Sequence, residues 1–215
     1  MTYHDLQIID ETNHYIVVVK PVGVLSQKDI TNDEDMLTLI KAYLVDKYQK
    51  KGDAYLGLVH RLDRMTSGLM VFAKTSKGAS RLSEEIRNHT FIKEYITLVE
   101  GKICDNGSLV DYLNFDEKKL KAYIDNKNGK VARLSYEVLA YDGDNTVLRI
   151  KLETGRHHQI RVQMANFHHP LVGDSLYGSK VTKNIKLHAY KLAFLDPVTK
   201  ELKEYINYPT WYERK

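Results

Sequence analysis

The 215-residue chain is poor in several residue types that often define a protein's class: it has one cysteine, four prolines and one tryptophan. A single thiol, Cys104, excludes an internal disulfide and fits a reducing compartment. No stretch approaches the roughly 18 consecutive apolar residues of a membrane helix. Residues 1–21 also lack the basic start, apolar core and cleavage site of a secretory signal. The sequence therefore predicts a cytoplasmic protein without a membrane partner.

The motifs of common cofactor sites are missing as well. The chain contains no G-x-G-x-x-G and no G-x-x-x-x-G-K, so dinucleotide and ATP chemistry have no support. Histidine pairs occur at 157–158 and 168–169, but no H-E-x-x-H or cysteine-rich spacing accompanies them. We therefore expect neither a metal nor a cofactor. A histidine-dependent metallohydrolase is the alternative that these pairs leave open, and it predicts bound metal in the purified protein.

Nothing in the composition divides the chain. Its hydrophobic fraction of 43% and charged fraction of 28% are those of an ordinary globular protein. No proline- or serine-rich linker, repeat or low-complexity segment interrupts it. The net charge of +4 is mildly basic and compatible with a polyanionic partner. We expect a single domain over residues 1–215, monomeric and without an obligatory protein partner.

The hydrophobic pattern predicts both strands and helices. Two β-branched runs at 6–9 and 15–20, separated by a polar turn, indicate a hairpin. Between Asp33 and Lys50 apolar residues recur at helical spacing, with acids at the start and lysines at the end, as the helix dipole favours. Because several strands are joined by turns too short for a parallel crossover, we predict an α+β fold on a largely antiparallel sheet. The further strands are expected at 68–74, 90–100, 131–141, 146–153, 188–195 and 202–206, and the further helices at 76–88 and 157–167.

The densest group of polar residues is the run G-L-V-H-R-L-D-R-M-T-S-G at residues 57–68. In it Asp63 lies between Arg61 and Arg64, whose positive charges favour the ionised carboxylate. An ionised aspartate on a loop can act as a nucleophile or a base. The run is also compatible with a solvated ion-pair turn, so by itself it leaves catalysis open.

Two further groups place polar side chains at the start of a helix and on the face of a strand. Residues 154–163, T-G-R-H-H-Q-I-R-V-Q, follow a strand and open a helix, where amides and arginines can bind an anion. Alternation along the strand at 90–100 puts Lys93, Tyr95 and Thr97 on one face, and a tyrosine there can stack on a nucleobase. A helix start with solvated basic residues and a packing tyrosine explain the same patterns without a ligand.

Taken together, these motifs resemble the RluA-type family of pseudouridine synthases. The matching segments follow the family's order and span nearly the whole chain. A single motif can arise by chance, but several in the same order do not. They are K-P-V-G at 20–23, H-R-L-D and T-S-G-L within 60–69, K-E-Y at 93–95, T-G-R-H-H-Q-I-R at 154–161, H-P-L-V-G-D-S-L-Y-G at 169–178 and L-H-A at 187–189.

The resemblance implies an RNA pseudouridine synthase, an isomerase that converts specific uridines of ribosomal or transfer RNA. It implies a mixed, largely antiparallel central sheet flanked by helices, with an RNA-binding cleft across its middle. The target nucleotide is flipped out of its helix, because a stacked base cannot be detached and rotated. By family position Asp63 is the catalytic nucleophile or initiating group, Tyr95 stacks on the flipped uracil, and Arg161 pairs with Asp63. The substrate contacts implied are His60, Arg61, Leu62, Arg156 and Gln159.

The chain departs from the family pattern at a few positions. Val19 stands where asparagine is frequent, Gln163 stands where histidine is usual, and residues 166–168 replace a glycine-containing turn. These departures concern substrate contacts and not the predicted catalytic groups. We expect no separate N-terminal RNA-binding domain. A non-catalytic RNA-binding module on the same fold is the main alternative, and it predicts binding without turnover.

Overall fold

The computed structural model describes residues 1–31, 33–181 and 184–212. The chain divides into two compact units, each with its own hydrophobic core. The first unit comprises Met1–Ile92 together with Ala189–Lys215, and the second comprises Lys93–His188. Among the described residues, none of the helices combines the length and apolar character that a membrane crossing requires.

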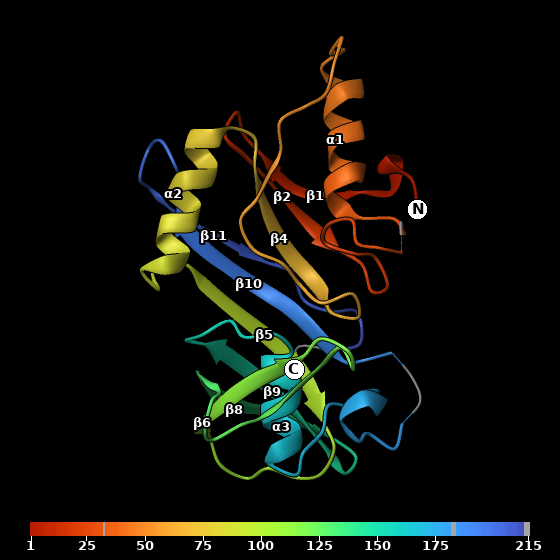
Figure 1. Ribbon diagram of the computed structural model, residues 1–215, viewed down its shortest axis with the longest axis vertical. Coiled ribbons are helices and arrows are strands. Elements are labelled where there is room, and N and C mark those ends of the chain that lie inside the picture. The colour runs from red at the N-terminus through yellow and green to blue at the C-terminus, as the bar shows by residue number, and fades with distance from the viewer. Residues whose placement is uncertain (32, 182–183, 213–215) are drawn as a thin grey trace. The chain divides into compact units, whose positions relative to one another are not determined.

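The first unit is built on a sheet in which β1, β2, β4 and β10 lie side by side in that order (Figure 1). The short β3 pairs with β4, and β11 pairs with β10. Every pairing in this unit whose register is described is antiparallel. The strands are β1 (Gln7–Glu11), β2 (Tyr15–Lys20), β3 (Gly57–Leu58), β4 (Ser67–Ala73), β10 (Leu187–Leu195) and β11 (Leu202–Ile206).

Two capped helices belong to the same unit, α1 (Met36–Lys47) and α2 (Ser76–Arg87) (Figure 1). The side chain of Asp35 accepts a hydrogen bond from the backbone N–H of Thr38 and so caps α1. Thr75 caps α2 in the same way by accepting from Gly78. Each cap satisfies an amide that the helix itself leaves unpaired, which fixes where the helix starts.

The core of the first unit follows the alternation of its central strands. Tyr15 and Val17 of β2 pack with alternate residues of β4 and with Leu82 of α2. The residues that alternate with them, such as Ile16 and Phe72, lie on the other face of the sheet and are equally inaccessible to solvent. Both faces of these strands are therefore covered, which explains why the sequence here reads as a continuous apolar run.

A buried carboxylate ties β1 to α1 and to the residue that follows β4. The side chain of Glu11 is 8% exposed and accepts hydrogen bonds from the ammonium groups of Lys47 and Lys74. The hydroxyls of Tyr43 and Tyr48 donate to it as well. Burial raises the pKa of Glu11, but these four hydrogen bonds outweigh burial and lower it to about 2.

We expect Glu11→Gln to lower the free energy of unfolding at pH 7 by about 2 kcal/mol. A carboxyl whose pKa is lowered on folding stabilises the protein above its unfolded pKa of 4.5 and loses that contribution as the pH falls toward 2. The difference between wild type and variant in urea unfolding should therefore be smaller at pH 3 than at pH 7. The exposed Glu201→Gln serves as a control and is expected to change little; a pH-independent effect of Glu11→Gln would contradict the account.

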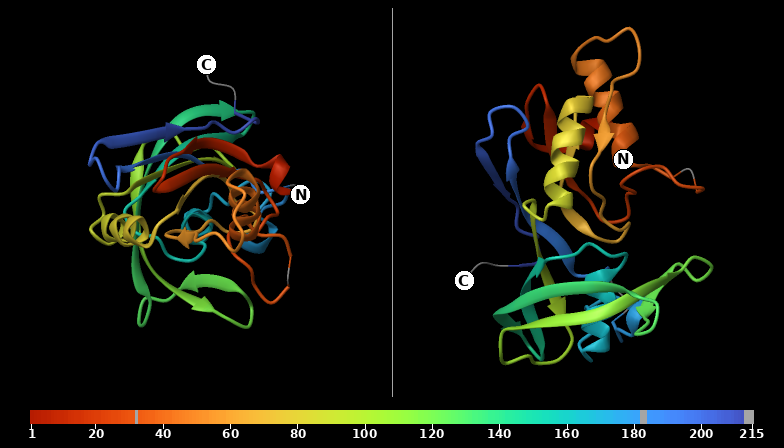
Figure 2. Two further views of the ribbon diagram at one scale, coloured as in Figure 1. Left: turned by 90° about the horizontal axis from the view of Figure 1, so that it is seen from above. Right: turned by 60° about the vertical axis from the view of Figure 1, so that its left-hand side comes forward.

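The second unit contains an antiparallel sheet in the order β5, β9, β8, β6, β7. Figure 2 shows the ribbon from two further directions. The helix α3 (Gln159–Asn166) packs on this sheet through Val162, which contacts a cluster that includes Leu113, Ala122 and Ala132. The short helix η2 (Ser175–Tyr177) contributes Tyr177 to the same cluster. The strands are β5 (Ile92–Val99), β6 (Gly107–Asp116), β7 (Lys121–Ile124), β8 (Lys130–Asp142) and β9 (Asn145–Leu152).

The predicted α+β class is confirmed, and all of the predicted helices and strands are present with boundaries shifted by a few residues. Three strands were not predicted, namely β3, β6 and β7. The prediction of a single catalytic domain over residues 1–215 stays a prediction.

Candidate active site

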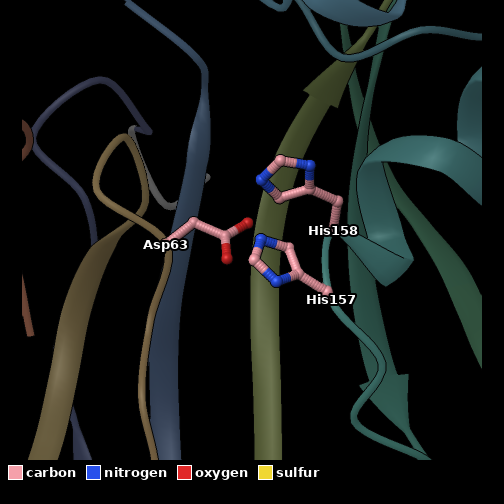
Figure 3. A group of neighbouring side chains, drawn as sticks. All are labelled: Asp63, His157 and His158. Atoms are coloured by element: carbon pink, nitrogen blue, oxygen red, sulfur yellow. The ribbon is translucent and has the colours of Figure 1, made fainter. Parts of the chain in front are cut away.

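Asp63 lies on the loop between β3 and β4 in the first unit and is partly buried (Figure 3). The residue before it, Leu62, has both of its backbone groups bound by one side chain. Ser26 Oγ donates to the Leu62 carbonyl at 2.7 Å and accepts from the Leu62 N–H at 3.1 Å. After Asp63 the chain turns tightly, because the N–H of Thr66 donates to the Asp63 carbonyl. The backbone that carries Asp63 is thus fixed on both sides.

The K-P-V-G turn at 20–23 is bonded to the same loop. Gly23 N–H donates to the carbonyl of Arg64, and Arg64 Nε donates back to the carbonyl of Gly23 at 3.0 Å. Arg64 also forms an ion pair with Asp33 at 2.7 Å. Gly23 has φ +89°, a conformation that side chains disfavour, so glycine suits this turn.

Lys20 lies fully buried at the end of β2, next to the loop. Its ammonium group donates to the carbonyls of Pro21, Val24 and Arg64 at 2.7–3.0 Å, which matches its three N–H donors to three acceptors. Burial lowers the pKa of Lys20 to about 7, while the charge of Asp63 acts to raise it. Lys20 therefore joins the turn to the loop, and its protonated form adds a positive charge near Asp63.

Specific contacts also hold His60 and Gly68, which lie toward the two ends of the polar run at residues 57–68. His60 is buried, and its Nε2 accepts a hydrogen bond from the Val71 N–H at 3.1 Å, so this nitrogen carries no proton and His60 is a neutral imidazole. Gly68 has φ +121°, and an added Cβ would lie 2.4 Å from the carbonyl oxygen of Ala189. Glycine at 68 is therefore required for β4 to approach β10.

In the second unit, Gln159 organises the start of α3. Its Oε1 accepts from the hydroxyl of Thr154 at 2.8 Å and from the N–H of Arg156 at 2.9 Å, while Nε2 donates to the carbonyl of Arg133. These bonds use both ends of the Gln159 amide to shape the turn. The Arg156 side chain is exposed and donates from Nε to the carbonyl of Val131.

Two histidines lie directly before α3 (Figure 3). The ring of His157 stacks on Phe115, with centroids 4.1 Å apart. His158 takes the left-handed conformation with φ +52° and forms a 2.9 Å hydrogen bond between Nδ1 and the hydroxyl of Tyr177. The Tyr177 hydroxyl also accepts a hydrogen bond from the N–H of Ala122 in β7 and donates to the carbonyl of the same residue. This network attaches the start of α3 to the sheet.

The guanidinium of Arg161 is held in a fixed orientation within the second unit. Its Nε and Nη2 donate to the two carboxylate oxygens of Asp174 at 2.6 and 2.9 Å. Both side chains are almost fully buried, at 6% and 1% exposed. The carbon of the guanidinium lies 5.0 Å from the centre of the Tyr177 ring, within the range of a cation–π contact. A buried bidentate pair of this kind combines strength with geometric specificity.

We expect Asp174→Asn to lower the free energy of unfolding by about 3 kcal/mol, because a buried guanidinium loses a carboxylate that accepts two hydrogen bonds. Urea denaturation of the two proteins at pH 7 measures the difference. Asp53→Asn is the matched control, since Asp53 pairs with Lys41 at the surface and its loss is expected to matter little. Equal stability losses in the two variants would contradict the importance of the buried pair.

The predicted stacking residue, Tyr95, lies on β5 opposite Ile150 of β9 and is 6% exposed. Lys93, two residues earlier on the same strand face, has its pKa lowered by burial. Its ammonium group lies 3.7 Å from where a Cβ on Gly155 would be. Lys93 of β5 thus lies beside Gly155 of the T-G-R motif in the second unit.

The predicted site residues therefore fall into two sets. His60, Arg61, Leu62 and Asp63 share one loop of the first unit. Tyr95, Arg156, Gln159 and Arg161 belong to the second unit. The pairing of Arg161 with Asp63 stays a prediction, as do the substrate contacts.

Sequence reasoning did not assign roles to three residues that hold the site. Asp174 lies in the H-P-L-V-G-D-S-L-Y-G segment, so a motif marked it, but nothing in the sequence links it to Arg161. Tyr177 belongs to the same segment. Ser26 carried no signal, since its bonds to Leu62 join residues 36 positions apart.

Two of the departures from the family pattern, at Gln163 and at residues 166–168, have structural explanations. Gln163 is fully buried, and its Nε2 donates to the carboxylate of Asp111 and to the carbonyl of Ala132. His168 has φ +64°, the left-handed conformation that a glycine adopts at no cost. Asn166 also donates to Asp111. These residues act within the fold around the end of α3.

Comparison with known proteins identifies the family. Residues 14–166 match the family described as RNA pseudouridylate synthase. An "Uncharacterized RNA pseudouridine synthase YhcT" of Bacillus subtilis (strain 168) is 34% identical over 206 residues, which are 93% of this chain and 67% of that protein. The chain belongs to the RNA pseudouridine synthases of the RluA type, a family of isomerases, as predicted.

Other relatives are longer than this chain. The "Ribosomal large subunit pseudouridine synthase D" of Buchnera aphidicola subsp. Baizongia pistaciae (strain Bp) is 40% identical over 165 residues, 69% of this chain and 52% of that protein. The protein of the same name from Yersinia pestis is 36% identical over 81% of this chain and 53% of its own length. The chain thus spans about half the length of these relatives.

Solved structures show the same fold. The structure titled "Human RNA Pseudouridylate Synthase Domain Containing 4" matches with a TM-score of 0.79 and 20% identity, covering 95% of this chain and 89% of the other. That titled "Human RNA Pseudouridylate Synthase Domain Containing 1" matches with a TM-score of 0.77 and 22% identity, covering 99% and 86%. The predicted pseudouridine synthase fold, a mixed and mostly antiparallel sheet with three helices, is confirmed for the described residues.

Proposed function

We propose that this protein isomerises uridine to pseudouridine in RNA, with Asp63 as the catalytic carboxylate. The observation that carries the proposal is the position of Asp63 on a loop whose flanking residues, Leu62 and Arg64, are both hydrogen-bonded to residues 20–26. A carboxylate held in this way meets the geometric demand of catalysis, in which small displacements of a reacting group are costly. The loop lies inside the segment that matches the family.

The reaction breaks the bond between uracil N1 and the ribose C1′, turns the base and joins C5 to C1′. The proton on C5 leaves and N1 gains one, so the atoms balance without a second substrate. In this proposal Asp63 starts bond cleavage, and Arg161 pairs with it and keeps it ionised. Tyr95 stacks on the flipped uracil and assists the loss of the C5 proton. Arg61 fills the gap that the flipped base leaves.

Both units contribute cations for an RNA backbone. Arg61, Arg64 and Arg156 are exposed, and they lie in the polar segments at residues 57–68 and 154–163. In the proposed substrate-binding set Arg61 and Arg156 contact the RNA, and His60, Leu62 and Gln159 support the segments that carry them. Since His60, Leu62 and Gln159 are buried and hydrogen-bonded within the fold, we assign them to shaping the loops that meet RNA. Phosphate contacts from arginine make the affinity fall as salt increases.

We propose ribosomal RNA of the large subunit as the target, because several relatives carry that substrate in their names. Transfer RNA is the alternative. Pseudouridines are mapped by carbodiimide modification and primer extension in both RNAs from cells with and without this gene. The proposal predicts that at least one site in large-subunit RNA loses its signal without the gene and regains it with the wild-type protein.

The possible outcomes separate the alternatives. A signal lost only from transfer RNA changes the target but keeps the activity. If every pseudouridine persists while the protein still binds RNA, a non-catalytic binding module explains the protein better. Complementation by Asp63→Asn as efficient as by wild type would remove the proposed catalyst.

A further inference from the structure

The hydroxyl of Ser26 stands out among the groups that the proposed reaction does not use. Ser26 is 6% exposed and follows the K-P-V-G turn. Its Oγ donates to the carbonyl of Leu62 and accepts from the N–H of the same residue. One side chain therefore satisfies both backbone groups of the residue next to Asp63, as a neighbouring strand would do in a sheet.

A loop residue without such a partner exposes its backbone groups to water and samples several conformations. Binding both groups to one buried hydroxyl restricts the φ and ψ angles of Leu62, whose own side chain is 6% exposed and anchored in the core. The direction in which the following Asp63 side chain leaves the backbone depends on those angles. One peptide bond therefore separates the residue that Ser26 holds from Asp63.

We propose that Ser26 is a positioning residue, which sets the orientation of the Asp63 carboxylate without touching the substrate. The inference rests on the proposed function, since it assigns a second residue to the same reaction. Removal of the hydroxyl leaves two backbone groups unsatisfied and lets Asp63 move away from the reactive position. A misplacement of about 1 Å at a reacting group can cost about a hundredfold in rate.

A second buried hydroxyl that bonds backbone groups, that of Thr146, provides a matched control. Thr146 in β9 is fully buried, and its Oγ1 accepts from the N–H of Ile103 at 3.0 Å and donates to the carbonyl of Gly101 at 2.8 Å. It makes the same two kinds of hydrogen bond as Ser26, but in the second unit and with a turn that contains no proposed site residue. Thr146→Val removes these bonds while keeping the shape of the side chain.

The test measures kcat and KM for pseudouridine formation with an RNA that wild type modifies, at a temperature where every variant is fully folded. We expect Ser26→Ala to reduce kcat by about tenfold to a hundredfold with KM within about twofold of wild type. Thr146→Val should lose stability but keep kcat within about twofold. Ser26→Thr, which retains the hydroxyl, should recover most of the lost kcat.

The proposal fails if Ser26→Ala keeps the wild-type kcat, or if Thr146→Val lowers kcat as much as Ser26→Ala does. If Ser26→Ala does not fold, Ser26→Cys takes its place, because a thiol stands at the position of the hydroxyl but is a much weaker hydrogen-bonding group, and a smaller loss of kcat in the same direction is expected. Wild type without any turnover would instead reject the proposed function itself. The two failures are therefore distinguishable.

Discussion

Replacing Asp63 with asparagine is expected to reduce pseudouridine formation by about a thousandfold or more while RNA binding stays within a few fold. Asparagine has nearly the same shape but neither the charge nor the basicity of the carboxylate, so it cannot start cleavage of the glycosidic bond. Single-turnover release of tritium from RNA that carries 5-tritiated uridine measures the chemical step. Fluorescence anisotropy with the same RNA measures binding.

The neighbouring acidic residue Asp33 supplies the control for this experiment. It pairs with Arg64 at the surface and lies outside the proposed catalytic set. Asp33→Asn should leave tritium release within about threefold of wild type. Near-normal release by Asp63→Asn, with protein purity verified, would refute Asp63 as the catalyst.

Replacement of Arg161 with methionine is expected to lower kcat by about a hundredfold or more, because the proposed partner of Asp63 is lost. This single change also leaves the carboxylate of Asp174 buried without its bidentate partner, so the variant loses stability as well. Activity and stability must therefore be separated before the result can be assigned to catalysis.

The double variant Arg161→Met with Asp174→Leu separates the two effects. Replacing both members of a buried ion pair with apolar residues is often neutral or stabilising, so we expect most of the lost stability to return. Turnover should not return, because no cation remains at position 161. Recovery of wild-type kcat in the double variant would show that Arg161 serves only the fold.

The helices and most strands could be predicted because their signals are local. The acids at 33–35 and the lysines near 47–51 marked α1, and the structure uses Asp35 as its cap. The β-branched run at 15–20 marked β2. In each case neighbouring residues in the sequence carry the whole pattern.

The strands β6 and β7 could not be predicted because their faces do not follow the simple alternation of apolar and polar residues. On β6 the apolar Val110 and Tyr112 are exposed, at 57% and 47%. The polar Asp111 lies between them on the other face of the strand, and its carboxylate accepts hydrogen bonds from the side-chain amides of Gln163 and Asn166. β7 has only four residues, too few for a period to be recognised.

The motifs in the sequence predict which residues form the candidate site, but not which residues hold them in place. The motifs marked Asp63, Tyr95 and Arg161 through their family positions. The bonds that fix these groups join Ser26 to Leu62 and Asp174 to Arg161, and they depend on how the chain folds. No periodicity or spacing in the sequence specifies such a pair, because any buried polar residue can in principle serve as a partner.

The proposed function requires that this chain itself rearranges uridine. Its most direct test is to incubate the purified wild-type protein with an unmodified large-subunit RNA transcript, without added cofactor, and to digest the RNA to nucleosides for chromatography and mass spectrometry. We expect a peak with the mass of uridine and the retention time of pseudouridine to appear at the expense of uridine. A transcript that is bound by the protein, shown by anisotropy, but keeps all of its uridine would contradict the account.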